Sequence, residues 1–172
     1  MKSHFLSRLT ALCIFGTNAY APPEGHAENQ KQEYRQQLAQ ENPTLLLARA
    51  LWGEARCCTR EEQIAIGYTA VNRQKKSKRP LQEILLAGYT CFKGVSGKQV
   101  LAPHLYDDPK IFDECIQIAR GILQGSYSDS TNGATHYYNP QRCTPSWAPD
   151  LKGKKRIQTS KGKSKHIFGK MK

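Results

Sequence analysis

The sequence predicts an α+β fold in which several helices precede a small β element. Apolar residues recur at helical spacing in the segments before Gly125, whereas polar loops and short runs of strand-forming residues follow it. The 172 residues, of which 38% are hydrophobic, suffice for one modest domain, and no internal repeat divides them. We therefore expect one mostly helical domain whose β element lies in the C-terminal part of the chain.

The first helix of this domain is expected to begin at Pro43, because Asn42 is a good N-cap and proline suits a first helical turn. Three apolar residues share one helical face with Glu54: Leu47, Ala50 and Leu51. The Glu54 carboxyl group would then face the core or a cleft, where burial disfavours the charged form. A glutamic acid that stays protonated can act as a general acid. The alternative is that Glu54 lies at a frayed helix end and points to water.

A second helix is expected after Thr59, which forms a capping box with Glu62. Its apolar pattern ends at Asn72-Arg73, and the basic residues that follow as far as Arg79 are interpreted as a solvated turn. Glu61 and Glu62 are interpreted as first-turn charges that favour the helix dipole, not as catalytic acids.

Two more helices and three strands complete the prediction. Pro80 starts a short helix that ends before Gly88, and Asp108-Pro109 opens a longer one that ends at Gly125. Residues 89–108 show no clean period and are interpreted as a loop. Strand character is found in three later segments: Ala134–Tyr138, Arg156–Ser160 and His166–Phe168.

Residues 1–21 have the pattern of a secretory signal peptide. A short basic region precedes an apolar stretch, and Ala19-Tyr20-Ala21 fits a cleavage site, with cleavage after Ala27 as a second option. The alternative is a buried N-terminal helix. Residues 22–42 are polar and are interpreted as a linker or a loose helix.

This leader predicts a protein that is secreted or that acts in the periplasm or cell wall. Leu12 directly before Cys13 does not fit a lipobox, and no stretch reaches the ~18 apolar residues of a membrane span, so we expect no stable membrane anchor. Five cysteines remain after the leader: Cys57, Cys58, Cys91, Cys115 and Cys143. In an oxidising compartment we expect at least one disulfide, which joins the Cys57/Cys58 corner or Cys91 to a later cysteine.

Five motifs occur in the chain in a fixed order. They are Leu-Ala-Arg-Ala-Leu-Trp-Gly-Glu-Ala-Arg at residues 47–56, Glu62-Gln63 leading to Ala70-Val71-Asn72-Arg73, Tyr89-Thr90-Cys91-Phe92, Gly133 to Pro140 with Pro145-Ser146-Trp147, and Lys165-His166-Ile167-Phe168. In these motifs the chain resembles the bacterial cell-wall hydrolases of the spore-cortex-lytic enzyme (SleB) type. The resemblance implies a lysozyme-like fold for a catalytic domain at residues 43–172, peptidoglycan as the substrate, and Glu54 as the catalytic acid. Cys57-Cys58 departs from the pattern, since many relatives have a glycine there.

The number of available carboxylates separates two mechanisms of glycan cleavage. A hydrolase usually needs a second carboxylate as base or nucleophile, and Asp129 and Asp150 are the candidates, although a turn residue and a cap are the simpler interpretations. A lytic transglycosylase needs Glu54 alone, first as acid and then as base. We therefore predict a lytic transglycosylase that cuts the MurNAc-GlcNAc strand. A muramidase with two carboxylates and an N-acetylmuramoyl amidase are the alternatives.

The candidate substrate-binding residues belong to the same motifs. Tyr137 and Trp147 offer flat rings with polar tips that suit a sugar face. Further candidates are Asn139, His136 and Asn72. His136 and His166 would be the zinc ligands of an amidase, but no further ligand stands at suitable spacing, so we expect neither a metal nor another cofactor.

The chain is strongly basic, with a formal net charge of +12. From Leu151 to Lys172 it has nine Lys and Arg residues and no acid. This basic C-terminal segment is either simply solvated or attracted to anionic wall polymers. A nucleic-acid-binding protein is the non-enzyme alternative, but the predicted export argues against a nucleic-acid partner.

Overall fold

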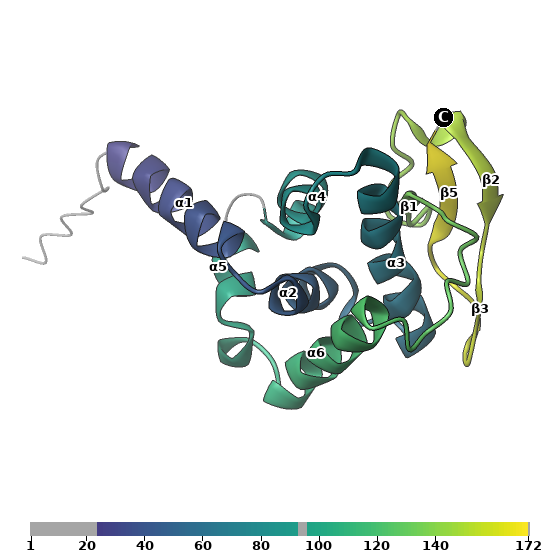
Figure 1. Cartoon of the computed structure of the whole chain (residues 1–172), viewed down its shortest axis with the longest axis horizontal. Helices are drawn as coiled ribbons and strands as arrows, with labels where there is room; N and C mark the ends of the chain where they lie inside the picture. Colours follow the sequence, from purple (N-terminus) through teal and green to yellow (C-terminus); the bar gives the residue numbers. More distant parts are fainter. Residues whose placement is uncertain (1–23, 93–95, 172) are drawn as a thin grey trace, which may run out of the picture.

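The computed structural model of the chain describes residues 24–92 and 96–171, so the predicted signal peptide lies outside the described residues. The helices are α1 (Glu24–Ala39), α2 (Pro43–Ala55), α3 (Arg60–Ser77), α4 (Leu81–Gly88), α5 (Ser96–Leu101) and α6 (Pro109–Leu123), with short 3-10 turns η1 (Thr90–Phe92), η2 (Pro103–Leu105) and η3 (Ala148–Asp150). The strands are β1 (His136–Tyr138), β2 (Leu151–Lys155), β3 (Gln158–Thr159), β4 (Gly162–Lys163) and β5 (Ile167–Met171). Figure 1 shows α2 among the other helices and the strands at one side, next to α3. The predicted α+β class is confirmed.

Helix α2 is the centre of the core. It begins as predicted, because the Asn42 side chain accepts the backbone N–H of Thr44 at 2.8 Å and Pro43 occupies the first turn. Its apolar residues are almost wholly buried: Leu46, Leu47, Ala50, Leu51 and Trp52. Helices α3 and α6 pack against it closely. A Cβ atom at Gly67 of α3 would lie 2.4 Å from the Cδ1 atom of Ile122, so the end of this α6 side chain packs directly against the glycine.

Helix α3 continues to Ser77, so the interpretation of the basic residues after Asn72-Arg73 as a solvated turn is wrong for most of that segment. The side chains of Asn72 and Arg73 are polar, yet each is half-buried and bonded to the chain that follows α6. Asn72 donates to the carbonyl of Ala134 at 3.0 Å, and Arg73 donates to the carbonyl of Thr135. Because these polar side chains form hydrogen bonds with a distant segment, they can be half-buried within a helix. They interrupt the apolar pattern of the sequence, but the helix continues.

The sequence suggested that residues 89–108 form a plain loop. The structure shows instead that this segment includes η1, α5 and η2. The end of α5 is held by Arg49 of α2, which donates to the carbonyls of Val100 and Leu101 at 2.7 and 2.9 Å. These elements are too short to produce a periodic apolar pattern, and a tertiary contact fixes them.

The larger sheet has the antiparallel order β1-β5-β2. In its register Tyr137 lies opposite Phe168, which is fully buried. Strand β2 was not predicted, because three lysines dominate its five residues, and it is held by pairing with β5. The segment predicted as one strand at Arg156–Ser160 contributes only β3, which forms a small hairpin with β4.

Residues 24–39 form the helix α1, which leads up to the other helices at its C-terminal end (Figure 1). Leu38 of this helix is only 2% exposed and belongs to the core. Among the described residues, no helix combines the length and the apolar character that crossing a membrane requires.

Candidate active site

Glu54 lies next to the last residue of α2 and borders a cavity of about 730 Å³. The cavity lies between the corner that joins α2 to α3, the turn η1, strand β1 with the loop after it, and the residues before β5. Glu54 is half-buried, which places its carboxyl group between the core and the cavity. The prediction that it faces a cleft therefore describes its position better than the alternative of a frayed, solvated helix end.

Three donors from two other segments hold the Glu54 carboxyl group. The hydroxyl of Thr90 and the backbone N–H of Cys91 donate to Oε1 at 2.9 and 2.8 Å. The hydroxyl of Tyr137 lies 3.3 Å from Oε2. The turn η1 thus fixes one carboxyl oxygen, while strand β1 contacts the other only weakly.

Gly53 allows η1 to approach the acid. A Cβ atom at this position would lie 2.5 Å from the Cβ atom of Cys91, a distance at which something must shift. The absence of a side chain at Gly53 therefore lets the Thr90 and Cys91 donors reach Glu54. Sequence reasoning did not single out Thr90 or Cys91 as site residues, although both belong to the third motif of the resemblance.

Tyr137 links the acid to the core. Its ring contacts those of His166 and Phe168, with centroids 5.4 and 6.2 Å away. Burial raises the pKa of Tyr137 well above its usual value, with a further contribution from the neighbouring Tyr89 and Glu54. Its hydroxyl therefore stays protonated and can donate to Glu54 throughout the neutral range.

Two more of the predicted substrate-binding residues, Trp147 and Asn139, border the same cavity as Tyr137. The Trp147 ring meets the ring of Tyr138 edge-on at 6.0 Å. Tyr138 also borders the cavity, as do two cationic residues that the sequence did not single out, Arg142 and Lys165. Lys165 belongs to the fifth motif of the resemblance, whereas Arg142 lies in none of the motifs and is brought near Glu54 only by the folded arrangement.

His136 is not among the residues that border the cavity around Glu54. Its ring lies edge-on to that of Trp147 at 5.3 Å, and its Nδ1 atom bonds to the Thr135 hydroxyl at 3.0 Å. Burial lowers the pKa of His136 to about 4, and the positive charges of Arg73 and Lys76 contribute. His136 is thus a neutral residue that packs behind Trp147.

Asn72 and the two candidate second carboxylates also lie outside this cavity. Asn72 donates to Asp129 at 2.9 Å, and Asp129 in turn accepts the backbone N–H groups of Thr131 and Gly133 at 2.8 and 2.9 Å. Burial works to raise the pKa of Asp129, but the bonds from Thr131, Asn72 and Gly133 outweigh it and leave the pKa lowered. Asp129 therefore braces its turn, and Asp150 is an exposed residue of η3.

The cysteines do not form the expected disulfide. Each of the five in the described part of the chain has a free thiol: Cys57, Cys58, Cys91, Cys115 and Cys143. Burial raises the pKa of Cys58 and of Cys115 to about 12, so these two are thiols and not reactive thiolates near neutral pH. The disulfide was predicted from the oxidising compartment and from the number of cysteines. Neither of these determines which cysteines lie close together in the fold.

Glu62 lies in the first turn of α3, as the sequence suggested, but it is also buried and paired. It is 2% exposed, and its Oε1 atom accepts both the backbone N–H and the ring Nδ1 of His166, at 2.9 and 2.8 Å. Its partner is 104 residues away in the sequence, so no local pattern could have revealed the pair.

The fold and the cavity define a small, mostly helical domain with an acid at the end of its central helix. The model of the Cell Wall Hydrolase family matches residues 59–168, which is more than half of the chain, and the chain therefore belongs to this family. This confirms the predicted cell-wall hydrolase. The match begins after Glu54, so the role of this acid stays a prediction.

One solved structure has a similar fold: the catalytic domain of the germination-specific lytic transglycosylase SleB from Bacillus anthracis. The TM-score is 0.52 and the sequence identity is 23%, and the similarity covers 76% of this chain and 95% of that one. It confirms the predicted lysozyme-like architecture. A comparison with curated protein sequences gave no match.

Proposed function

We propose that the chain is a lytic transglycosylase that cuts the glycan strand of peptidoglycan between MurNAc and GlcNAc, with Glu54 as its single acid and base. One observation carries this proposal. Among the described residues that border the cavity, Glu54 alone has a carboxyl group. A hydrolase that activates water needs a second carboxylate in the same site, whereas an internal attack by the substrate's own hydroxyl does not.

The hydrogen bonds of Glu54 suit a group that first donates and later accepts a proton. Oε1 accepts from Thr90 and Cys91, so it is the oxygen that keeps a fixed position. Oε2 has only the long contact to Tyr137 and is the oxygen that we assign to proton transfer. In the first step Glu54 gives a proton through Oε2 to the glycosidic oxygen. The resulting carboxylate then takes the proton of the C6 hydroxyl on the muramyl sugar, which attacks C1 and leaves a 1,6-anhydro end.

The other residues around the cavity fit a glycan that carries acidic peptides. Tyr138 and Trp147 supply flat apolar rings on which sugar faces can lie. Arg142 and Lys165 supply positive charge, which attracts the carboxylates of peptidoglycan stem peptides. The named activity of the B. anthracis neighbour, a lytic transglycosylase, agrees with this proposal.

The proposal includes export to the wall, which rests on the predicted signal peptide at residues 1–21. The exposed lysines of the basic C-terminal segment, such as Lys154, Lys161 and Lys163, lie around the small strands β2 to β4. They would hold the enzyme near anionic wall polymers by long-range attraction.

Mass spectrometry of the products released from purified peptidoglycan tests the mechanism. We expect muropeptides with 1,6-anhydromuramyl ends. Reducing sugar ends would identify a muramidase or glucosaminidase instead, and freed stem peptides with intact glycan would identify an amidase. Either of the last two results would overturn the proposed function.

A further inference from the structure

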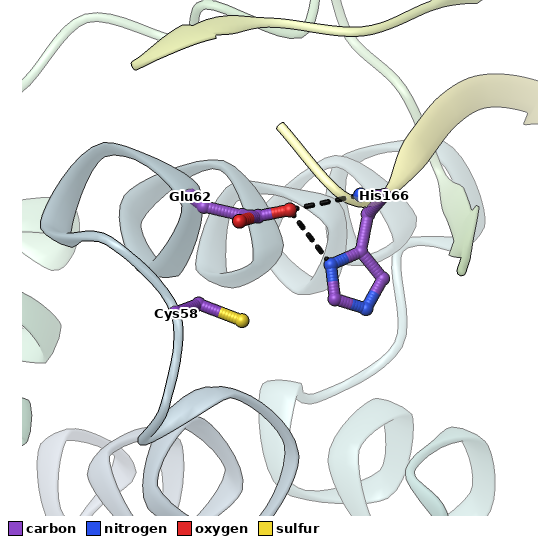
Figure 2. Close-up of side chains that lie close together, drawn as sticks. All are labelled: Cys58, Glu62 and His166. Carbon is purple, nitrogen blue, oxygen red and sulfur yellow. Dashed lines mark hydrogen bonds and ion pairs between the residues drawn. The ribbon is translucent and has the colours of Figure 1, made fainter. Parts of the chain in front are cut away.

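Three side chains that could bind a metal lie close together, as Figure 2 shows, and two of them border the cavity around Glu54. Cys58 lies in the corner between α2 and α3, Glu62 lies in the first turn of α3, and His166 directly precedes β5. One potential ligand atom from each residue lies within 4.8 Å of those of the other two. The cluster therefore joins the helical part of the molecule to the central strand of the sheet.

The three donors match a borderline-soft cation in type and in number. A thiolate, an imidazole nitrogen and one carboxylate oxygen suit Zn²⁺, whereas Ca²⁺ and Mg²⁺ prefer sites made of oxygens alone. With zinc bonds of about 2.0–2.3 Å, tetrahedral ligand atoms lie about 3.3–3.6 Å apart. The candidate ligand atoms lie within 4.8 Å of one another, and Nδ1 of His166 is 2.8 Å from Oε1 of Glu62, so small side-chain rotations would bring them to this spacing.

The surroundings of the cluster hold two of its ligands in place. The side chains of Glu62 and His166 are only 3% and 12% exposed. Both hydrogen bonds drawn in Figure 2 end on Oε1 of Glu62, and one of them comes from the backbone N–H of His166. This backbone bond can persist while Oε2 of Glu62 and Nδ1 of His166 turn to a metal. It is the kind of supporting contact that orients metal ligands in proteins.

A fourth ligand position of a bound ion would face the cavity. Cys58 and His166 both border the cavity around Glu54, whereas Glu62 lies behind them. Three protein ligands with one position facing a cavity is a common arrangement for zinc.

We propose that Cys58, Glu62 and His166 form a binding site for one Zn²⁺ ion at the edge of the Glu54 cavity. Binding releases the thiol proton of Cys58 to solvent and forms a sulfur–zinc bond. The site does not depend on the proposed transglycosylase function, and it differs from an amidase centre built on His136, which lies outside the cavity. The His166 ring meets that of Tyr137 edge-on at 5.4 Å, so the ion would also fix the residue that contacts Glu54.

Cobalt titration tests the site on the purified chain, which is first stripped of metal by a chelator and kept reduced by a phosphine. We expect one Co²⁺ per chain and the near-ultraviolet absorption of a thiolate–cobalt bond, which Zn²⁺ then abolishes because zinc binds such sites more tightly. In Cys58→Ser the absorption should disappear, and the affinity for Zn²⁺ should fall at least about tenfold. Cys143→Ser is the matched control, since Cys143 borders the same cavity but is not part of the cluster.

Thermal unfolding gives a second readout. Zn²⁺ should raise the melting temperature of the native chain and of Cys143→Ser, but not that of Cys58→Ser. Three results would overturn the site: a native chain that binds no Co²⁺, an absorption that Cys58→Ser retains, or an absorption that Cys143→Ser loses. The titration of the native chain decides the question even if Cys58→Ser fails to fold.

Discussion

The hydroxyl of Tyr137 reaches across from β1 to Oε2 of Glu54 at the end of α2, at a distance of 3.3 Å. This contact steadies the carboxyl oxygen that we assign to proton transfer. Tyr137→Phe keeps the ring packing on His166 and Phe168 and removes only the donor. We expect kcat on peptidoglycan to fall about tenfold with little change in KM, since one hydrogen bond to a charged group contributes about 1.5–3 kcal/mol and this one is long. An unchanged kcat would show that Oε2 does not depend on Tyr137.

Glu54→Gln should abolish cleavage while the fold and the binding of the wall persist. Gln has nearly the same size, but it has no acidic proton to give and cannot act as a base afterwards. The loss of an acid–base group typically costs about 10²–10⁴-fold in rate. Release of soluble muropeptides measures the activity, and circular dichroism and sedimentation with purified walls measure fold and binding. A variant that keeps more than about a tenth of the native rate would place the acid elsewhere.

Gly53→Ala should displace η1 from Glu54. The new Cβ atom would lie 2.5 Å from that of Cys91, and such overpacking costs about 1–3 kcal/mol, against the roughly 1 kcal/mol that alanine gains over glycine in a helix. We expect a lower midpoint of urea unfolding and a slower cleavage rate. The double variant Gly53→Ala/Cys91→Gly removes the colliding atom, so its loss of stability should be smaller than the sum of the two single losses.

Asp129→Asn should lower stability without removing activity. The Asp129 carboxylate accepts bonds from Thr131, Gly133 and Asn72, and an amide in its place leaves one of these donors unpaired, at a cost of about 1–3 kcal/mol. Asp150→Asn is the control and should change neither property, because Asp150 is exposed. A stably folded Asp129→Asn protein whose cleavage rate falls more than about 100-fold would identify Asp129 as a second catalytic carboxylate.

His136 should make stability depend on pH in the mildly acidic range. The folded chain holds the His136 ring neutral down to about pH 4, whereas the unfolded chain protonates it below about pH 6.5. The unfolded state thus binds more protons between these values, and the free energy of unfolding falls as the pH drops from about 6.5 toward 4. His136→Gln should show a smaller fall, as measured by urea unfolding at neutral pH and at about pH 5. Parallel stability curves for the two proteins would contradict this prediction.

Local signals in the sequence predicted the parts of the fold that local interactions determine. The Asn42 cap and the apolar face of α2 placed Glu54 beside a cavity, because a cap and a helical period act within a few residues. The motifs of the resemblance also placed Tyr137, Trp147 and Asn139 around that cavity. The family and the α+β class followed from the same signals.

Long-range contacts explain what the sequence did not predict. Glu62 fits a first-turn acid in every local respect, and only its pairing with His166 shows that it is buried. The length of α3 depends on bonds from Asn72 and Arg73 to residues that follow α6. The donors from η1 depend on the close approach at Gly53, which no spacing rule reveals.

The order of the strands has a consequence for biosynthesis. Strand β5 is the middle strand of the sheet, yet it follows both of its neighbours in the sequence. Neither β1 nor β2 can pair with β5 before residues 167–171 have emerged from the ribosome, and Tyr137 has no Phe168 to pack against until then. Because the cavity wall opposite Glu54 belongs to β1, the cavity takes its final shape only after β5 has been made, so the site is assembled late in synthesis although Glu54 is made early.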